Sequence, residues 1–325
     1  MKFLIALITA IALVIPTQVS AEDKSVKEVS ELLQDISVTV KSGSGEGSGI
    51  IITRTIPVAL NPTGKPLTVK VNFIWTAAHV IDNLRSVRTV IKDGRTIKIV
   101  EFKDAQIVQE LVEDGRRDGE VKMEAKVIKY SDSENGEDLA LLMVRKKGFI
   151  DKSVTFYNDG GKPVAIGTEL YHCGSLLGQT GSNSLTRGII SQIGRVLDLG
   201  TGDGVVFDQT TVTAFPGSSG GGVFLSERSG KNAGQYVGML VRGAGETFNL
   251  IVPVRRIRKY AKKEGILWAV DEMAPTPTLK EVLSLPIEGG EAKPSEGTKL
   301  TKHSVKFPTL FEHNLHRGNN DAKHK

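Results

Sequence analysis

Short runs of strand character recur along the whole chain, and this recurrence constrains its fold more than any other feature. Some runs alternate apolar and polar residues, as Val69, Val71 and Phe73 do, while others are wholly apolar. Turn-rich segments separate the runs, and the segment at 150–162 divides them into two series. This pattern predicts an all-β protein made of two similar β units. The expected strands cover residues 36–40, 69–75, 96–100, 106–108, 121–130, 139–144, 165–172, 186–193, 205–213, 222–225, 235–241 and 248–252.

Regular elements other than strands are expected only near the two ends of the folded region. Residues 22–34 have the apolar spacing of a short helix, and residues 253–260 predict a second helix with a basic, solvated face. Within the first unit, residues 110–120 are highly charged and predict an exposed loop. Prolines and glycines interrupt the end of the chain, so residues 266–325 are expected to form a disordered tail.

The first 21 residues have the composition of a secretory signal peptide. Lys2 provides a positive start, residues 3–15 an apolar core, and Val19-Ser20-Ala21 a small-residue cleavage signature. The apolar core is short for a bilayer span, which favours a cleaved signal over an uncleaved anchor. The mature protein is therefore expected in an exported compartment, periplasmic or extracellular, with no stable membrane anchor after cleavage.

Charge and cysteine content exclude some classes of protein. The formal net charge is +5, and much of the basic excess lies in residues 299–325. The rest of the chain is close to neutral, which argues against a nucleic-acid-binding function. Cys173 is the single cysteine, so no intrachain disulfide can form.

A glycine-rich stretch, Thr213-Ala-Phe-Pro-Gly-Ser-Ser-Gly-Gly-Gly-Val-Phe224, is the first candidate for chemistry. Gly217 and Gly220 allow a tight turn around Ser219, because glycine adopts backbone angles that strain other residues. Such a turn suits a serine nucleophile whose hydroxyl is exposed beside backbone N–H groups. A surface loop without function has the same composition, so partners elsewhere in the chain must decide.

Histidines that could act as the base for this serine are few. Four of the six lie scattered in the expected tail (His303, His313, His316 and His324), in a spacing that does not favour a metal site. His79 and His172 remain. His172 neighbours Cys173, but adjacent residues on a strand point to opposite faces, which argues against a Cys–His dyad. His79 follows a strand and has small neighbours, so it is the preferred base.

An acid that orients the histidine completes this kind of site. Asp138 directly precedes the apolar strand at 139–144, where a buried carboxylate needs a partner. Asp132, in the preceding polar loop, is the alternative. The order His79, Asp138, Ser219 is that of chymotrypsin-type enzymes, whereas the G-x-S-x-G elbow of α/β-hydrolases requires its histidine after the serine.

At these residues the chain resembles the trypsin-like serine proteases of the chymotrypsin fold, with the HtrA/Deg family as the nearest branch. Thr76-Ala-Ala-His-Val80 is similar to the histidine motif of that family, Asp138-Leu-Ala-Leu-Leu142 to its aspartate motif and Pro216-Gly-Ser-Ser-Gly-Gly221 to its serine motif. Three further segments are similar to the family's barrels: Gly47-Ser-Gly-Ile-Ile51, Gly174-Ser-Leu-Leu-Gly178 and Arg187-Gly-Ile-Ile-Ser191.

Some positions depart from the family pattern. Ser218 stands where HtrA proteins usually carry asparagine, and Gly222 replaces a common proline. The segment after Tyr260 is short and rich in breakers, so no PDZ domain is expected there, which puts the family's usual peptide sensing in doubt.

The resemblance implies two antiparallel six-stranded β-barrels, with the first in residues 22–150 and the second in residues 151–265. It also implies a serine endopeptidase that acts on proteins or peptides through an acyl-enzyme and needs no cofactor or metal. The implied oxyanion hole consists of the backbone N–H groups of Gly217 and Ser219.

The resemblance places Thr213 near the base of the primary substrate pocket, with Val241, Arg242 and Gly243 along one wall. A neutral Thr213 argues against substrates with Arg or Lys at the cleaved position. Arg242 either attracts acidic substrates or is a solvated strand residue. Two other functions stay open: a catalytically silent trypsin-fold binding or scaffold protein, and a serine esterase of another fold.

Overall fold

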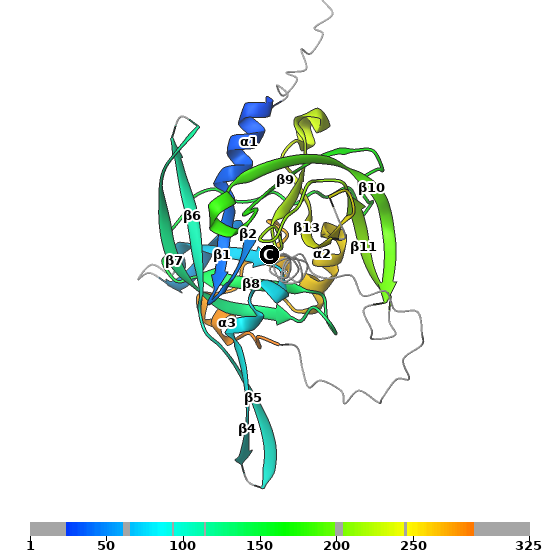
Figure 1. Ribbon diagram of the computed structural model, residues 1–325. Helices are drawn as coiled ribbons and strands as arrows, with labels where there is room; N and C mark the ends of the chain where they lie inside the picture. Colours follow the sequence, from blue (N-terminus) through cyan, green and yellow to red (C-terminus); the bar gives the residue numbers. More distant parts are fainter. Residues whose placement is uncertain are drawn as a thin grey trace, which may run out of the picture.

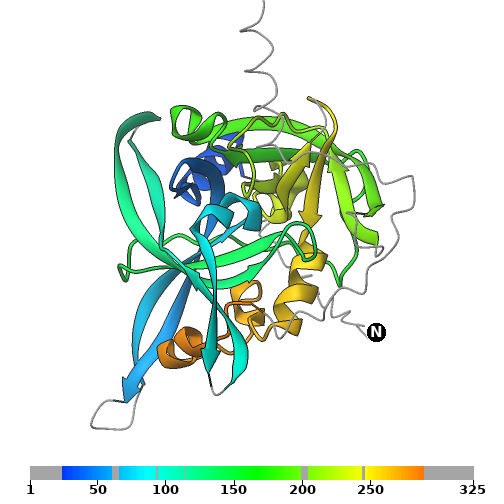
Figure 2. The ribbon, with the colours of Figure 1, turned by 60° about the horizontal axis from the view of Figure 1, so that its bottom comes forward.

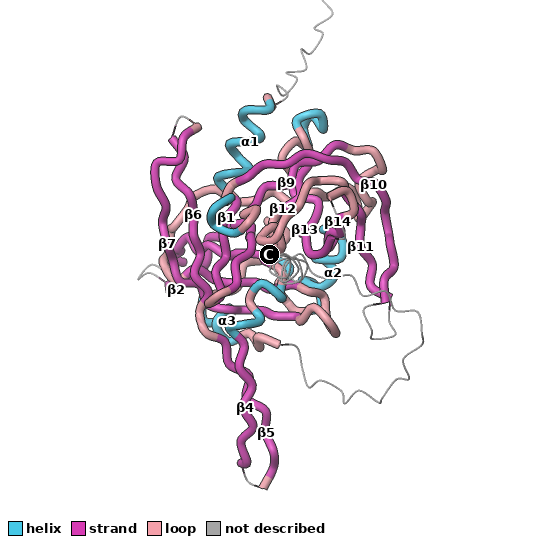
Figure 3. The backbone as a smooth tube through the Cα atoms, in the orientation of Figure 1, coloured by secondary structure: helices cyan, strands magenta, loops and turns pink. Residues whose placement is uncertain are grey.

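Two closed, antiparallel, six-stranded β-barrels make up the body of the protein, as the sequence predicted (Figure 1). The computed structural model describes residues 24–60, 66–92, 94–113, 115–198, 204–243 and 246–288. Strands dominate both halves, and the helices are short and peripheral (Figure 3).

The first barrel has the strand order β1-β2-β3-β8-β7-β6, and pairing of β1 with β6 closes it. Its wholly buried strand is β8, whose six residues are apolar because both faces of the strand are covered. The core contains large side chains such as Phe73 and Trp75. Its strands are β1 (Ser37–Ser42), β2 (Gly45–Leu60), β3 (Pro66–Thr76), β6 (Ala105–Glu113), β7 (Arg116–Ser131) and β8 (Leu139–Val144).

The second barrel has the strand order β10-β11-β14-β13-β12-β9, and β9 pairs with β10 to close it. Strands β12, β13 and β14 are buried along their whole length, which explains why most of their side chains are apolar; the buried Arg242 and Asn249 are hydrogen-bonded. Its strands are β9 (Glu169–Gly174), β10 (Ser184–Asp198), β11 (Gly204–Thr210), β12 (Gly222–Leu225), β13 (Tyr236–Gly243) and β14 (Asn249–Pro253).

Both predicted helices are present. Helix α1 (Val26–Asp35) begins with a capping box, in which the Ser25 hydroxyl accepts from the backbone of Glu28 and the Glu28 side chain accepts from Ser25. Helix α2 (Val254–Lys263) follows β14 directly and buries one face on the barrels. Short 3₁₀ helices lie between the strands: η1 (Ala78–Val80), η2 (Asp82–Leu84), η3 (Gly178–Gly181) and η4 (Glu227–Asn232), the last with a kink at Gly230.

Two hairpins differ from the sequence-based expectation. Strands β4 (Arg85–Lys92) and β5 (Arg95–Phe102) form a separate ribbon that projects from the first barrel, where only 96–100 was expected as a strand (Figure 1). The charged loop expected at 110–120 is instead the end of the β6–β7 hairpin. Arg117 of β7 forms an ion pair across the hairpin with Glu110 of β6, and a second ion pair along its own strand with Glu120.

The expectation of a disordered tail from residue 266 is wrong as far as residue 288. This segment forms η5 (Leu267–Ala269) and α3 (Leu279–Ser284) and returns to the first barrel, where α3 lies beside β2 (Figure 2). Prolines prevent long regular elements here but do not prevent packing, and Trp268 is only 3% exposed. Residues 289–325, and the expected signal peptide at 1–21, lie outside the described residues. Among the helices that the structure describes, none is long and apolar enough to cross a bilayer.

Candidate active site

The His79 and Asp138 side chains are in contact. His79 lies in η1, just after β3, and Asp138 directly precedes β8. Strands β3 and β8 pair so that Thr76 lies opposite Ala140, which brings the two loop residues together. His79 Nδ1 is 3.0 Å from both carboxylate oxygens of Asp138, and the His79 backbone N–H donates to Oδ1 at 3.1 Å.

Asp138 is held as a buried carboxylate. It is 1% exposed, and its φ of 55° lies in the left-handed region, which aspartate tolerates better than most residues. Burial raises the pKa of this carboxyl, but His79, the hydrogen bonds from it and the charge of Arg242 together lower the pKa below its ordinary value. An ionised Asp138 can fix the imidazole with Nδ1 protonated and Nε2 free to accept a proton.

Asp132, the alternative acid, has another position. Its Oδ1 accepts the backbone N–H groups of Glu134 and Asn135, and its carbonyl accepts the N–H of Asp138 at 3.1 Å. Asp132 therefore shapes the loop that presents Asp138, and it is Asp138 that contacts the imidazole.

Ser219 lies in a turn between β11 and β12 that is pressed against the first barrel. Gly220 adopts a φ of 84°, and a Cβ on it would lie 2.2 Å from the carbonyl oxygen of Ser48. Gly47 lies between the serine turn and Val80, the residue after His79. A Cβ on Gly47 would lie 3.0 Å from the Ser219 carbonyl oxygen and 2.6 Å from the Val80 side chain. The serine turn thus faces the loop that carries His79.

The hydroxyl of Ser219 and the Nε2 of His79 have no hydrogen-bond partner among the described residues. Catalytic hydrogen bonds are often long without substrate and tighten when it binds. Both atoms are therefore available for a partner that substrate would bring, or for each other.

The two expected oxyanion donors lie in the same turn. Gly217 has a φ of 91°, and there is no room for a side chain, because its Cβ would lie 2.2 Å from the Ser175 carbonyl oxygen. Within the described part of the chain, the backbone N–H groups of Gly217 and Ser219 donate to no protein group.

Of the expected pocket residues, Thr213 is half-buried and its carbonyl accepts from the Thr186 hydroxyl at 2.8 Å. Val241 and Gly243 are buried in β13. Arg242 is 7% exposed, so the interpretation as a solvated residue is wrong. Its Nη2 donates to the Ser133 carbonyl at 2.7 Å, which links the second barrel to the loop that presents Asp138.

Arg256 on α2 is a site residue that sequence reasoning missed. Its Nε donates to Glu137 Oε2 at 2.5 Å and its Nη2 to the Glu137 carbonyl at 3.2 Å, directly before Asp138. The guanidinium also lies 4.8 Å from the centre of the Phe207 ring. Its position in a run of basic residues indicated only a solvated helix face, and no local signal distinguishes it from the exposed Lys259.

His172 and Cys173 do not form a second site. His172 is fully buried with Nδ1 2.9 Å from the Gly222 carbonyl, and burial lowers its pKa to about 4. Cys173 lies in the hydrophobic core, and burial raises the pKa of its thiol to about 12. A neutral imidazole and a protonated thiol cannot act as a nucleophilic pair at neutral pH.

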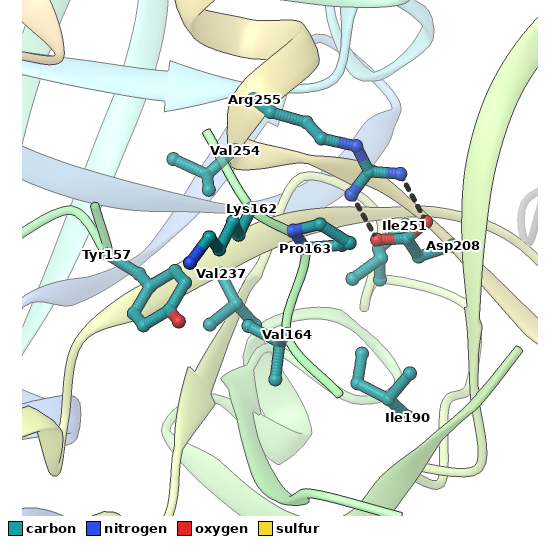
Figure 4. A pocket seen from close by; sticks show the side chains of 10 residues that line it. All are labelled: Tyr157, Lys162, Pro163, Val164, Ile190, Asp208, Val237, Ile251, Val254 and Arg255. Atoms are coloured by element: carbon teal, nitrogen blue, oxygen red, sulfur yellow. Dashed lines mark hydrogen bonds and ion pairs between the residues drawn. The ribbon is translucent and has the colours of Figure 1, made fainter. Parts of the chain in front are cut away.

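A small pocket in the second barrel lies away from these residues (Figure 4). It has a volume of about 10 Å³, which is room for about one water molecule. Arg255 closes one side through two hydrogen bonds of 2.6 Å to Asp208. Among the described residues, no group of three or more His, Cys, Asp or Glu side chains could hold a metal ion.

Two proteases are among the solved structures with a similar fold. One is an inactive form of Rv3671c from M. tuberculosis in which a serine is replaced by alanine, with a TM-score of 0.50, 17% identity and coverage of 75% of this chain and 93% of that one. Another is the HtrA-type protease AlgW with a tripeptide, with a TM-score of 0.49 and 18% identity; the match covers 75% of this chain but only 64% of that one.

Sequence comparison gives the family. No curated protein matches the chain. The model of the trypsin-like peptidase domain matches residues 47–239, which include His79, Asp138 and Ser219. By this match, and with the two barrels described above, the chain belongs to the trypsin-like peptidase family.

Proposed function

We propose that the protein is an exported serine endopeptidase that hydrolyses peptide bonds through Ser219, His79 and Asp138. The observation that carries the proposal is the contact of His79 Nδ1 with the buried Asp138 carboxylate, on the side of the first barrel that faces the Ser219 turn. Membership in the trypsin-like family supports the reaction class.

The mechanism begins when Ser219 Oγ attacks the scissile carbonyl carbon and His79 Nε2 takes the hydroxyl proton. Asp138 stabilises the resulting imidazolium, and the N–H groups of Gly217 and Ser219 bind the oxyanion of the tetrahedral intermediate. The intermediate collapses to an acyl-enzyme while His79 returns the proton to the leaving amine. Water then attacks the ester, again with His79 as base, and releases the carboxylic acid and free Ser219.

The substrates are proteins or peptides. Thr213, Val241 and Gly243 offer no buried carboxylate to a substrate side chain, so we expect no preference for Arg or Lys at the cleaved position. Arg242 is committed to the Ser133 carbonyl, which argues against its acting as a freely available anchor for acidic substrates.

The test uses the chain from Glu22 onward with unfolded casein and a fluorophosphonate probe. Wild type should cleave casein and take up the probe on Ser219, whereas Ser219→Ala should do neither. Ser86→Ala, which removes an exposed hydroxyl on the projecting ribbon, is the matched control and should behave as wild type. Absence of both cleavage and labelling in folded wild type would overturn the proposal.

Export is tested separately. In cells that express the full chain, protein recovered outside the cytoplasm should begin near Glu22 by N-terminal sequencing. Cytoplasmic protein that retains Met1 would contradict it.

A catalytically silent binding protein is the second candidate, because Ser219 Oγ forms no hydrogen bond with His79 within the described residues. It predicts that folded wild type stays unlabelled by the fluorophosphonate, and that Ser219→Ala binds the same peptides with the same affinity.

A further inference from the structure

Ser48 of β2 joins the first barrel to the turn of the second barrel that carries Ser219, residues 216–219 (the nucleophile turn). The residue is fully buried, and every polar atom it carries is engaged. Its backbone N–H donates to the Ser219 carbonyl at 2.7 Å, and its hydroxyl donates to the Gly217 carbonyl at 2.6 Å. The same hydroxyl accepts the Ser175 backbone N–H at 2.7 Å, and the Ser48 carbonyl accepts the Thr76 hydroxyl at 2.7 Å.

All four carbonyls of the turn from Pro216 to Ser219 are held by hydrogen bonds. Ser48 holds those of Gly217 and Ser219. The Pro216 carbonyl accepts the Leu177 N–H at 2.6 Å, and the Ser218 carbonyl accepts the Gly221 N–H at 3.0 Å.

Held carbonyls determine where the N–H groups point, because a trans peptide unit directs its C=O and its N–H to opposite sides. The N–H of Gly217 belongs to the same peptide unit as the Pro216 carbonyl, and the N–H of Ser219 to that of the Ser218 carbonyl. These two N–H groups therefore face away from the contacts that hold the turn, and no described protein group accepts from them.

Ser48 acts on both of these peptide units. Its hydrogen bonds to the Gly217 and Ser219 carbonyls fix the peptide units before and after the one that carries the Ser219 N–H. Through Ser175 it also fixes the loop whose Leu177 N–H holds the Pro216 carbonyl, on which the Gly217 N–H depends.

We propose that Ser48 is a positioning residue for the oxyanion hole, and that its hydroxyl holds the Gly217 and Ser219 N–H groups in the orientation that binds a developing oxyanion. The proposal rests on the proposed peptidase function. A hydroxyl can accept from the Ser175 N–H and donate to the Gly217 carbonyl at the same time, which a methyl group cannot do and a thiol does only weakly. Space is short: a Cβ on Gly174 would lie 2.7 Å from Ser48 Oγ, and one on Gly221 would lie 3.1 Å from Ser48 Cβ.

The test compares Ser48→Ala with Ser37→Ala. Ser37 is a matched control because it is also a buried serine of the first barrel, and its hydroxyl donates to the Leu33 carbonyl of α1, not to the nucleophile turn. Steady-state casein-peptide hydrolysis gives kcat and KM, and inhibition gives the affinity for a peptide boronate, whose bound oxygen occupies the oxyanion position.

For Ser48→Ala we expect kcat to fall by about 10-fold or more, with KM within about 2-fold, because oxyanion contacts form only in the transition state. Boronate affinity should fall in parallel. Ser37→Ala should keep kcat within about 2-fold of wild type, even if both variants lose stability to a similar extent.

Equal kcat in Ser48→Ala and Ser37→Ala, with wild type active, would overturn the role of Ser48 and leave the peptidase proposal intact. An inactive, folded wild type would instead overturn the peptidase proposal and the role of Ser48 with it. If Ser48→Ala does not fold, Ser48→Cys, which fills the site with a somewhat larger group and a weaker donor, should show the same separation of kcat from KM.

Discussion

Two buried titratable side chains, Asp138 and His172, are each kept in one charge state by different means. Asp138 lies beside His79 and within the field of Arg242, and these favourable charges outweigh burial, so its pKa is lowered and the carboxylate persists. Among the described residues no charged group shifts the pKa of His172, and burial lowers this pKa to about 4 against the opposing effect of the Gly222 carbonyl, so the imidazole is neutral. The ionised Asp138 can orient His79, whereas the neutral His172 packs behind the turn that carries Ser219, with its ring beside Gly174 and Gly221.

The neutral His172 makes stability depend on pH. Its pKa is about 4 when folded and about 6.5 when unfolded, so between these values the unfolded chain binds a proton that the native protein does not. Stability therefore falls as the pH drops from about 6.5 to about 4, by on the order of 3 kcal/mol. His172→Asn, whose amide can still donate to the Gly222 carbonyl, should flatten this dependence.

Urea unfolding at several pH values measures the effect. An unchanged slope of stability against pH in His172→Asn would show that other groups cause the dependence. The lowered pKa of Asp138 acts in the same direction, but only below about pH 4, where the unfolded chain binds a proton at Asp138 that the folded protein does not.

Among the elements, helix α2 does more than cover the second barrel. Arg256 holds the side chain and carbonyl of Glu137, and Arg242 on β13 holds the Ser133 carbonyl. Both contacts reach from the second barrel to the loop of the first barrel that presents Asp138. The loop holds Asp138 in a left-handed conformation that is uncommon for a residue other than glycine, so its position depends on support from outside.

Arg256→Gln tests this support. We expect kcat to fall several-fold because Asp138 is less firmly placed against His79, and the acid limb of the pH–rate profile should move because the imidazolium is less stabilised. Lys259→Gln, an exposed basic residue of the same helix, is the control and should leave both unchanged. A normal profile in Arg256→Gln would show that the loop keeps its shape without α2.

In the whole molecule, the segment after the second barrel closes the fold by packing against the first. Arg54 of β2 donates to the Trp268 carbonyl at 2.7 Å, and Trp75 Nε1 donates to the Ala269 carbonyl at 3.0 Å. The Trp268 and Phe73 rings meet edge to face with centres 4.8 Å apart. The two barrels are thus joined by the contacts of the turn that carries Ser219 with the first barrel, and also by this segment.

Removal of the Trp268 side chain should destabilise the whole protein. We expect Trp268→Ala to lower the free energy of unfolding by about 3–5 kcal/mol, as for other buried aromatic residues. Leu283→Ala, at a side chain 43% exposed on α3, should cost much less. Urea unfolding gives both values when it is followed by the circular dichroism of the backbone, which does not rely on the removed tryptophan. Equal losses in the two variants would contradict the role of Trp268.

Local patterns predicted much of the fold and part of the site. Alternating and wholly apolar runs predicted two β units, because a strand buried on one face alternates apolar and polar residues and a strand buried on both faces is apolar throughout. Motif order pointed to His79 and Asp138, which are in contact, while the reaction of Ser219 with His79 stays a prediction. Neither the β4 strand nor the packing of Trp268 could be predicted, since an exposed ribbon and a proline-rich segment carry no burial pattern.

The sequence by itself determined the class of fold and the residue types available for chemistry, because backbone preference and apolar periodicity act over a few neighbouring residues. Only the tertiary structure decided which polar groups support the loops that carry Ser219 and Asp138. The Ser48 hydroxyl meets Gly217 across 169 residues, and Arg256 meets Glu137 across 119. Such contacts depend on the path of the whole chain. The local sequence around a serine or an arginine does not show whether its side chain is solvated or supports a loop of the site.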